Sequence, residues 1–285
     1  MSTAPLNDWH RAWPAPAKIN IFLHVVGRRD DGYHLLQTVF RFIDRCDTLH
    51  FRPRPDGRVM LTNPIPGVPM DSDLTVRAAR ALQQATGCTF GVDITLDKIL
   101  PMGGGLGGGS SDAATVLMAL NRLWGCHLDT ARLQAIGLAL GADVPVFIHG
   151  RATFAEGIGE HFHDLTLPPA WYLILVPAVA VPTVEIFRAA DLRRDTPAMT
   201  PADWQPGQGG NDLEPVACRL YPEVARHLAW LRGLPLARRA AMSGSGACCF
   251  AEFATEAEAR QALAALPADM TGFVAAGLDQ HPIFG

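Results

Sequence analysis

The sequence lacks the cysteine spacing of metal-binding and disulfide-stapled proteins. Its six cysteines form no Cys-x-x-Cys pair, and only Cys248 and Cys249 lie close together. Structural zinc sites need clustered ligands at short, regular spacings, so the sequence assigns no metal ligand. The pattern favours buried or incidental thiols in a reducing compartment, and we therefore expect a cytoplasmic protein.

Long apolar runs and an excess of basic charge are also missing. The longest apolar run, residues 171–181, is too short and too interrupted by proline to span a bilayer. The N-terminus has no basic start followed by an apolar core, so no signal peptide is expected. The formal net charge is −4 and the arginines are scattered rather than arranged in a stripe. We therefore expect neither a membrane nor a nucleic acid as a partner.

The chain does contain enough apolar sequence for two hydrophobic cores. It has 285 residues, of which 48% are hydrophobic, and this length exceeds the usual size of one domain. Two domains that share a cleft are the default expectation for such a chain. A proline-flanked stretch near Pro168 and Pro169 suggests the division. We place the boundary at about residue 160, which gives expected domains at residues 1–160 and 161–285.

Hydrophobic periodicity predicts a mixture of strands and helices. The expected strands lie at residues 19–26, 35–43, 48–52, 58–62, 92–96, 171–176 and 247–253. The expected helices lie at residues 73–86, 113–124, 129–140, 222–231 and 256–266. Residues 1–14 look like a loose leader, and residues 141–145 look like a turn. The run of early strands favours an α+β fold over a doubly wound sheet.

A glycine-rich segment between an expected strand and an expected helix is the most informative feature. It consists of Pro101, Met102, Gly103, Gly104, Gly105, Leu106, Gly107, Gly108, Gly109, Ser110 and Ser111. Glycine accepts positive φ and leaves the peptide N–H groups open to an anion. With Ser110, Ser111 and Asp112 as the expected helix caps, the segment predicts a phosphate cradle at a helix N-terminus.

Three other interpretations of this segment are less favoured. A flexible connector is rarely bracketed by a strong strand and a strong helix. A Walker loop needs a lysine after its last glycine, but Ser110 follows Gly109 directly. Gly103, Gly105 and Gly108 match the bare dinucleotide fingerprint, yet a turn and a second helix follow where that motif needs a strand with an acidic end. An atypical phosphate loop remains.

Three segments, in this order, resemble the motifs of a kinase superfamily. They are Pro-Ala-Lys-Ile-Asn at residues 16–20, the glycine-rich loop, and Ser-Gly-Ser-Gly at residues 243–246. They resemble the galactose, homoserine, mevalonate and phosphomevalonate (GHMP) kinases over almost the whole chain. Residues 27–34 and 141–147 further resemble the branch that acts on 4-diphosphocytidyl-2-C-methyl-D-erythritol in the non-mevalonate isoprenoid pathway. A longer leader and Ser245 in place of threonine are the departures.

The resemblance implies an ATP-dependent phosphotransferase that uses Mg²⁺ and phosphorylates the 2-hydroxyl of the methylerythritol unit. It implies the two-domain GHMP-kinase fold, with an N-terminal ATP-binding domain that carries the loop and a ferredoxin-like C-terminal domain. It also gives Lys18 and Asp143 catalytic roles. Lys18 would hold the acceptor hydroxyl and Asp143 in register and lower the pKa of that hydroxyl, and Asp143 would act as general base or orient the hydroxyl. Taken alone, Lys18 fits a solvated strand end and Asp143 a plain turn residue.

The same resemblance implies how the cytidine end of the substrate is bound. Tyr33 and Phe187 would stack on the two faces of the cytosine, and His34 would hydrogen-bond its edge. Asn20 and Thr183 would make further polar contacts to the substrate. For Phe187, ordinary helix core is the competing interpretation.

The second glycine-rich turn has two interpretations. Ser243, Gly244, Ser245 and Gly246 would lie against the phosphates or close the cleft from the C-terminal domain. A simple hairpin turn explains these four residues nearly as well.

Two alternative functions remain open at this stage. One is another small-molecule kinase of the same superfamily, although residues 33–34 would then have no evident purpose. The other is a non-catalytic metabolite sensor with the same fold. A sensor would tolerate the loss of Lys18 and Asp143, so the presence of both argues against it. The oligomeric state, the adenine contacts and the magnesium ligands are not assigned by the sequence.

Overall fold

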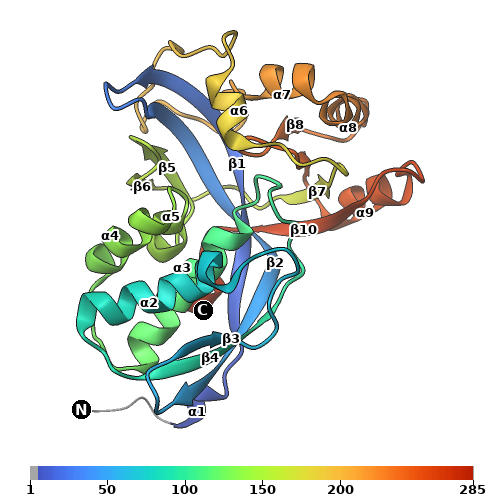
Figure 1. Ribbon diagram of the computed structural model, residues 1–285. Coiled ribbons are helices and arrows are strands. Elements are labelled where there is room, and N and C mark those ends of the chain that lie inside the picture. Colours follow the sequence, from blue (N-terminus) through green and yellow to red (C-terminus); the bar gives the residue numbers. More distant parts are fainter. Residues whose placement is uncertain (1–5, 285) are drawn as a thin grey trace.

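Two long antiparallel strands run through both parts of the molecule. The computed structural model describes residues 6–284, and in it β1 (Trp13–Arg28) pairs with β2 (His34–Arg54) along most of its length. The hairpin reaches from the lower helical part into the upper part (Figure 1). Residues on these two strands therefore contact elements from both halves of the chain.

Shorter strands complete the N-terminal part of the sheet. β4 (Gly91–Asp97) pairs antiparallel with β2, and β3 (Val59–Leu61) pairs parallel with β4. β5 (Thr153–Glu156) joins the other end of β2 and pairs with β6 (His161–Asp164). The resulting order on this side is β3-β4-β2, with β1 and β5 also paired to β2.

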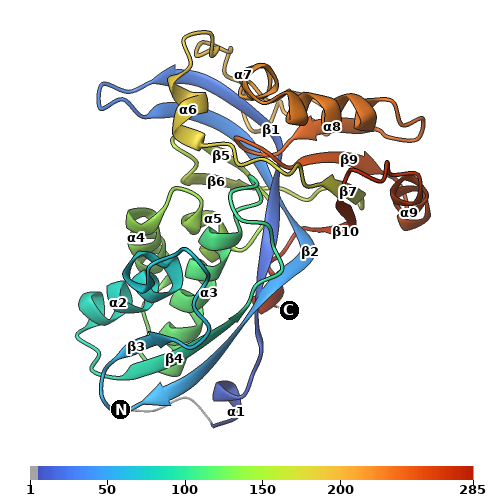
Figure 2. The same ribbon diagram turned by 45° about the vertical axis from the view of Figure 1, so that its right-hand side comes forward.

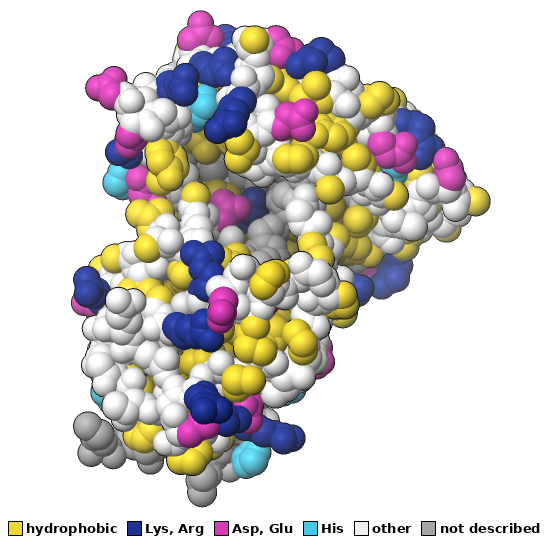
Figure 3. All heavy atoms as spheres, in the orientation of Figure 1, with side chains coloured by type: hydrophobic (Ala, Val, Ile, Leu, Met, Phe, Trp, Pro, Cys, Tyr) yellow, Lys and Arg dark blue, Asp and Glu magenta, His cyan; other side chains and the backbone are white. Residues whose placement is uncertain are grey.

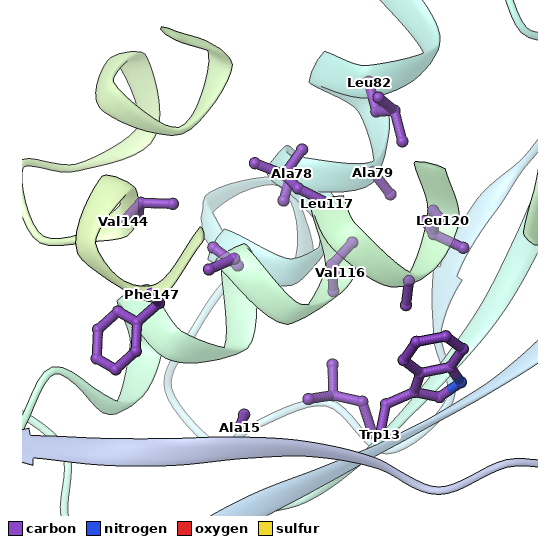
Figure 4. Packing of buried hydrophobic residues seen from close by; sticks show 14 of the residues in the cluster. Trp13, Ala15, Ala78, Ala79, Leu82, Val116, Leu117, Leu120, Val144 and Phe147 are labelled. Carbon is purple, nitrogen blue, oxygen red and sulfur yellow. The ribbon is translucent and has the colours of Figure 1, made fainter. Parts of the chain in front are cut away.

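Four helices lie together beside this part of the sheet. They are α2 (Leu74–Thr86), α3 (Gly108–Leu123), α4 (Thr130–Leu140) and α5 (Val144–His149) (Figures 1 and 2). The short α1 (Leu6–Trp9) and η1 (Met70–Ser72) precede them in sequence. Leu117 and Leu120 of α3 pack in one buried cluster with Trp13 of β1 and Phe147 of α5 (Figure 4). Burial of these apolar side chains is the main stabilising contribution to this core.

The C-terminal part has the βαββαβ arrangement of a ferredoxin-like fold. Its strands are β7 (Trp171–Leu175), β8 (Arg239–Met242), β9 (Cys249–Phe253) and β10 (Gly272–Leu278). Its helices are α6 (Thr183–Arg188), α7 (Glu214–Leu220), α8 (Pro222–Arg232) and α9 (Glu256–Ala264), followed by η2 (Pro282–Phe284). The strand order β10-β7-β9-β8 is antiparallel throughout. The expected α+β fold with a ferredoxin-like C-terminal part is confirmed.

The β1–β2 hairpin joins the halves of the chain in two ways. β10 pairs with β2 at Gly277 and Leu278, which makes one continuous sheet. The tip of the β1–β2 hairpin, through Leu23 and Val25, packs into the hydrophobic cluster of the C-terminal part. The division near residue 160 stays a prediction, and any such division leaves this hairpin tip in the core of the other part.

The expectation of a loose leader is wrong from residue 6 onward, and residues 1–5 lie outside the described part of the chain. Trp13 begins β1, is only 2% exposed, and meets the Phe51 ring edge-on at 6.3 Å. Pro14 and Pro16 made this segment look unlike a strand in the sequence, because proline cannot donate a hydrogen bond to a neighbouring strand. Among the described residues, β2 is the strand with which β1 pairs, so no further strand pairs with the other edge of β1. Prolines are tolerated on such an edge strand.

The two strands expected at residues 35–43 and 48–52 are one strand, β2. The register between β1 and β2 shifts between Pro16 and Ala17, so that extra residues of β2 bulge outward. The exposed Asp44 and Arg45 lie at this bulge, and Asp44 accepts a hydrogen bond from Ala276 N at 2.7 Å. In the sequence, the consecutive charged residues Asp44 and Arg45 resemble a turn. In the structure, the β-bulge allows the strand to continue through them.

The expected turn at residues 141–145 leads directly into α5, which the sequence pattern missed. Pro145 lies in the first turn of this helix, where its absent N–H has no partner to lose. Strands β5, β6, β8 and β10 and helices α6 and α7 were likewise not predicted, and most of them are too short to show a period. Within residues 6–284, no helix is long and apolar enough to cross a membrane.

Candidate active site

A cavity of about 440 Å³ lies where the two parts of the molecule meet. The face in Figure 3 is hollowed between them, and acidic and basic side chains are visible inside the hollow. The cavity is lined by strand residues, by the glycine-rich loop, by the segment before α5 and by the C-terminal part. These lining residues include Lys18, Asn20, Thr38, Phe40, Pro101, Gly103, Gly104, Gly105, Gly107, Gly108, Gly109, Ser110, Ala142, Asp143, Thr183, Phe187, Gly244 and Ser245.

Lys18 and Asp143 form an ion pair in this cavity. The Lys18 Nζ lies 3.2 Å from Asp143 Oδ2, and it donates hydrogen bonds to Asn20 Oδ1 at 2.7 Å and to the Gly105 carbonyl at 3.1 Å. The lysine side chain is 2% exposed, whereas the aspartate side chain is 37% exposed. The ammonium is therefore fixed by three acceptors, and the carboxylate remains open to a ligand.

The strands and α5 explain these positions. Lys18 and Asn20 are two residues apart on β1 and so point to the same face of the sheet. Asn20 Nδ2 donates to Thr38 Oγ1 on β2 at 2.9 Å, and Thr38 Oγ1 in turn donates to the Phe22 carbonyl. Asp143 is the residue before α5, and its side chain does not cap that helix. Its carboxylate is thus available for Lys18 and for the cavity.

The glycine-rich loop alternates in backbone conformation before α3. Gly103, Gly105 and Gly107 have φ values of 68°, 75° and 72°, the region that favours glycine. Helix α3 begins at Gly108 and Gly107 is its N-cap residue, so Ser110, Ser111 and Asp112 already lie within the helix. The expectation that these three residues cap the helix is wrong, because the chain enters the helix earlier through a left-handed glycine.

The start of α3 has the properties of an anion site. The first N–H groups of a helix have no intrahelical acceptor, and the helix dipole favours negative charge there. Gly108, Gly109 and Ser110 occupy this first turn and line the cavity. By contrast, Met102 is 61% exposed, and Leu106 and Ser111 are buried. The expected phosphate loop thus presents most, but not all, of its residues to the cavity.

Close packing also requires glycine at positions 104 and 105 of the loop. A Cβ atom at Gly104 would lie 2.6 Å from Cys248 Sγ, and one at Gly105 would lie 2.1 Å from the Ser243 carbonyl oxygen. The Gly104 carbonyl also accepts a hydrogen bond from Cys248 N at 3.0 Å. The loop is thus packed against the turn at residues 243–246, which argues against the flexible-connector interpretation.

The second glycine-rich turn, residues 243–246, lines part of the cavity. It also contacts Asn20 and Gly105, which both accept hydrogen bonds from Lys18. Ser243 Oγ donates to the Gly105 carbonyl at 2.9 Å and accepts from Asn20 N at 3.2 Å. Ser245 Oγ lies 2.8 Å from Thr183 Oγ1 on α6. Gly244 and Ser245 line the cavity, whereas Ser243 is 1% exposed and braces the loop from behind. In the described part of the chain, this turn therefore supports the glycine-rich loop as well as connecting β8 to β9.

A buried charge cluster ties both ends of the glycine-rich loop together. Asp47 Oδ1 accepts hydrogen bonds from Ile99 N at 2.6 Å and Leu100 N at 2.8 Å, at the start of the loop. Lys98 Nζ donates to Asp47 and, at 2.7 Å, to Asp112 Oδ2 just beyond the loop. Burial raises the pKa of Asp112 to about 7, against the opposing charge of Lys98. Sequence reasoning missed this cluster because its members come from three separate elements.

Of the three residues expected to bind the cytosine, Phe187 of α6 lines the cavity, whereas Tyr33 and His34 do not. The His34 ring lies against that of Phe187, with 4.9 Å between the ring centroids and an angle of 34° between the ring planes. Tyr33, in the hairpin turn, is 59% exposed. The structure thus brings His34 and Phe187 together, while the stacking of Tyr33 and Phe187 on a base stays a prediction.

The six cysteines are free thiols, as the spacing suggested. Cys248 and Cys249 are buried, and burial raises the pKa of the Cys248 thiol to about 12. A thiol with such a pKa is a poor nucleophile near neutral pH. The cysteine beside the glycine-rich loop is therefore a packing residue.

Comparison with family models shows two matches in chain order. Residues 73–151 match the model described as the GHMP kinases N terminal domain, and residues 201–272 match the model described as GHMP kinases C terminal. The first match contains the glycine-rich loop and Asp143, and the second contains the turn at residues 243–246. Both matches agree with the fold described above.

Named relatives are similar over nearly the whole chain. A protein named 4-diphosphocytidyl-2-C-methyl-D-erythritol kinase from Dechloromonas aromatica is 64% identical over 95% of this chain and 98% of its own length. One with the same name from Thiobacillus denitrificans is 61% identical over 96% of this chain and 98% of its own length.

Solved structures show the same relationship. A crystal structure of 4-(cytidine 5'-diphospho)-2C-methyl-D-erythritol kinase has a TM-score of 0.81 and 37% identity, and covers 94% of this chain and 99% of that one. A homoserine kinase from Cytophaga hutchinsonii has a TM-score of 0.68 with 17% identity, over 95% of each chain. The second likeness concerns the fold alone.

Proposed function

The chain belongs to the 4-diphosphocytidyl-2-C-methyl-D-erythritol kinase family of the GHMP kinases, and from this premise we propose how its residues carry out the reaction. The protein is an ATP-dependent kinase that transfers a phosphoryl group to the 2-hydroxyl of 4-diphosphocytidyl-2-C-methyl-D-erythritol. The observation that supports the assignment of residues is the contact between Lys18 and Asp143 inside a cavity walled by the glycine-rich loop.

The triphosphate of ATP binds the glycine-rich loop in this proposal. Phosphoryl transfer needs positioning and charge stabilisation more than covalent chemistry from the protein. The N–H groups of Gly108, Gly109 and Ser110 and the N-terminal dipole of α3 supply both for the phosphate oxygens. The brace from Ser243 and the cluster around Lys98 hold the loop in place before ATP arrives, so less entropy is lost on binding.

Lys18 and Asp143 act on the acceptor hydroxyl. The Asp143 carboxylate accepts the hydroxyl proton as the oxygen attacks the γ-phosphorus, the bond from that phosphorus to the β,γ-bridging oxygen breaks, and ADP leaves. Lys18, held by Asn20 and Gly105, positions Asp143 and the hydroxyl relative to each other and lowers the pKa of the hydroxyl through its positive charge. The contact between Lys18 and Asp143 therefore supports these two roles in the phosphoryl transfer.

The donor set also fits a magnesium ion that is bound mostly through phosphate oxygens. Within residues 6–284, no three histidine, cysteine or acidic side chains form a metal-binding group. The Ser110 hydroxyl lines the cavity and is an oxygen ligand of the kind that Mg²⁺ takes. In this proposal Ser110 would hold the ion together with the phosphate oxygens of ATP, and Asp143 stays free to accept the proton. When bound, the ion neutralises the charge that develops on the phosphate oxygens.

The substrate assignment is tested by measuring ADP release with a panel of acceptors. Turnover should require 4-diphosphocytidyl-2-C-methyl-D-erythritol and should be at background with homoserine, mevalonate or galactose. CMP and CDP should inhibit competitively with that substrate, because they carry the base that Phe187 and His34 bind in this proposal. Equal turnover with another acceptor would indicate a different kinase of the superfamily, and no turnover with any acceptor would indicate a sensor.

A glycine substitution tests where the phosphates lie. Gly103→Ala should weaken ATP binding at least about tenfold, because the methyl group enters space that lines the cavity and that the phosphates need. Gly103 has a φ of 68° and a Cβ there would meet nothing within 4 Å, so the unliganded protein should fold. Gly107 is less suitable, since a Cβ there would lie 2.8 Å from the Phe147 ring and 3.1 Å from Lys18 Cε.

Gly87→Ala is the matched control for that experiment. Gly87 ends α2 with the same φ of 68° and the same open surroundings, but it does not line the cavity. Both variants should lose a similar amount of thermal stability through backbone strain. The dissociation constant for ATP, measured by calorimetry, should change in Gly103→Ala alone. Equal ATP affinities would place the phosphates away from Gly103.

A further inference from the structure

Arg194 holds the ring of His34, which lies against Phe187 of the cavity lining. Its Nε donates to His34 Nε2 at 3.1 Å. The same guanidinium donates from Nη1 to the Leu192 carbonyl at 3.0 Å, and from Nη2 to the Phe187 and Ala189 carbonyls at 3.0 and 2.7 Å. Three carbonyls at and beyond the end of α6 therefore fix the plane of the guanidinium, and this plane aims the Nε–H at the histidine ring.

This contact determines which ring nitrogen of His34 carries the proton. An arginine side chain donates and never accepts, and it stays charged at every physiological pH. His34 Nε2 must therefore offer its lone pair to Arg194, which leaves the proton of the neutral ring on Nδ1. Among the described residues, no hydrogen bond occupies Nδ1. The Nδ1–H is thus a free donor of fixed direction beside Phe187.

The surrounding charges keep the ring in this neutral form. Burial, Arg194 and, from the paired strand β1, Arg28 together lower the pKa of His34 below its ordinary value. Protonation would also place an N–H of the ring against the N–H of Arg194. The ring therefore resists protonation as the pH falls, and its donor pattern stays the same across the neutral range.

We propose that Arg194 is a positioning residue that determines base specificity by holding His34 as an Nδ1–H donor toward the cytosine edge. The inference rests on the proposed function, in which His34 meets the base. Cytosine offers the acceptors N3 and O2 on that edge, whereas uracil presents an N–H at position 3. A fixed donor matches the cytosine pattern and opposes the uracil N3–H, and a site that leaves a buried polar group unpaired discriminates strongly.

The free protein provides the first test, independent of activity. Nitrogen-15 NMR of histidine-labelled protein distinguishes the protonated ring nitrogen from the unprotonated one, and the His34 signals are identified by their absence in His34→Gln. We expect Nδ1 to be the protonated nitrogen in the parent protein, and a mixture of the two tautomers in Arg194→Met. A parent ring protonated on Nε2 would overturn the proposal.

Steady-state kinetics provide the second test. In Arg194→Met the KM for 4-diphosphocytidyl-2-C-methyl-D-erythritol should rise about three- to tenfold at pH 8, the effect of one mispaired hydrogen bond. It should fall again as the pH drops below the ordinary histidine pKa of about 6.5, because burial and Arg28 still hold the pKa of His34 under that value and a protonated ring donates from both nitrogens. The parent KM should stay flat over this range. The preference over the uridine analogue should shrink in the variant.

Two controls separate positioning of the base from a structural role of Arg194. Arg193→Met changes the neighbouring arginine, which is 60% exposed and paired with Asp195, and it should leave the KM, its pH profile and the base preference unchanged. Arg194→Lys keeps a charged donor and should restore part of the base preference. If Arg194 merely braced α6, the KM of Arg194→Met would rise equally at all pH values with an unchanged base preference, and the proposal would fail.

The proposed function has its own distinct failure in the same experiments. If the parent protein did not turn over the cytidine-containing substrate, the function would be wrong whatever the tautomer of His34. If the parent protein turned it over and His34→Gln kept the full preference for cytosine, the function would stand and the inference about Arg194 would be wrong.

Discussion

Asp143→Asn should lower kcat by about 10²- to 10⁴-fold, the usual contribution of a general base. Asparagine keeps the shape of the side chain, and its oxygen can still accept the hydrogen bond from Lys18, which lies 3.2 Å from the carboxylate. What it loses is the ability to take a proton and the negative charge in the cavity. The KM values for ATP and for the cytidine-containing substrate should therefore change by only a few fold.

The measurement is steady-state ADP release, with Asp97→Asn as the matched control. Asp97 ends β4, its side chain is 63% exposed, and its ion pair with His50 lies on the surface. The control should keep the parent's kcat. Near-normal turnover in Asp143→Asn would show that the residue only orients the hydroxyl and that another group takes the proton.

The parts of the site that lie close together in sequence were predictable. Within about 30 residues, the sequence contains a strand, a loop with an unusual number of glycines and a helix. The phosphate cradle follows from that pattern alone. Even there the sequence placed the helix start too late. Serine and aspartate are good caps, and only the backbone conformation reveals that Gly107 already turns the chain into α3.

Contacts between distant segments could not be derived from residue patterns. Lys18 and Asp143 were paired through the family resemblance, because their own surroundings indicate a strand end and a turn. The brace from Ser243 to Gly105 and the cluster around Lys98 join segments that fold together only through the whole sheet. Arg194 lies in a polar stretch with no regular structure, and its role depends on the carbonyls at the end of α6.

The same limit explains the errors in the fold. Periodicity detects a long element whose buried face repeats regularly, such as α2 or α3. It fails where prolines occupy a strand, as at the start of β1, and where a bulge interrupts the alternation, as in β2. It also fails for β10, in which small residues leave no clear alternation although the strand joins the two parts of the sheet.

Lys18→Met should also lower kcat by about 10²- to 10³-fold, because it removes the positive charge that holds Asp143 and the acceptor hydroxyl in register and lowers the pKa of that hydroxyl. Methionine fills similar volume in a site that is 2% exposed, and the Gly105 carbonyl keeps its hydrogen bond from Ser243. The Asn20 Oδ1 loses its partner, which costs about 1 to 3 kcal/mol of stability. The melting temperature and the ATP dissociation constant should show a folded protein that binds nucleotide.

Lys18→Arg tests whether charge alone is enough. A Cβ at Gly107 would already lie 3.1 Å from Lys18 Cε, so the loop leaves little room for a larger guanidinium. Arginine also presents a planar fork rather than a compact ammonium. We expect this variant to stay close to Lys18→Met in kcat. Recovery of parental turnover would show that the position of the charge matters little.

The double variant Lys18→Met, Asp143→Asn decides whether the two residues act as one unit. If Lys18 works by holding Asp143 and the hydroxyl in register, then the second substitution removes little that the first has left. The kcat of the double variant should therefore lie within a few fold of the kcat of the less active single variant, when both are measured at the same saturating substrate concentrations. Multiplication of the two single losses would instead mean that Lys18 and Asp143 stabilise the transition state independently, and the ion pair between them would then be a structural contact.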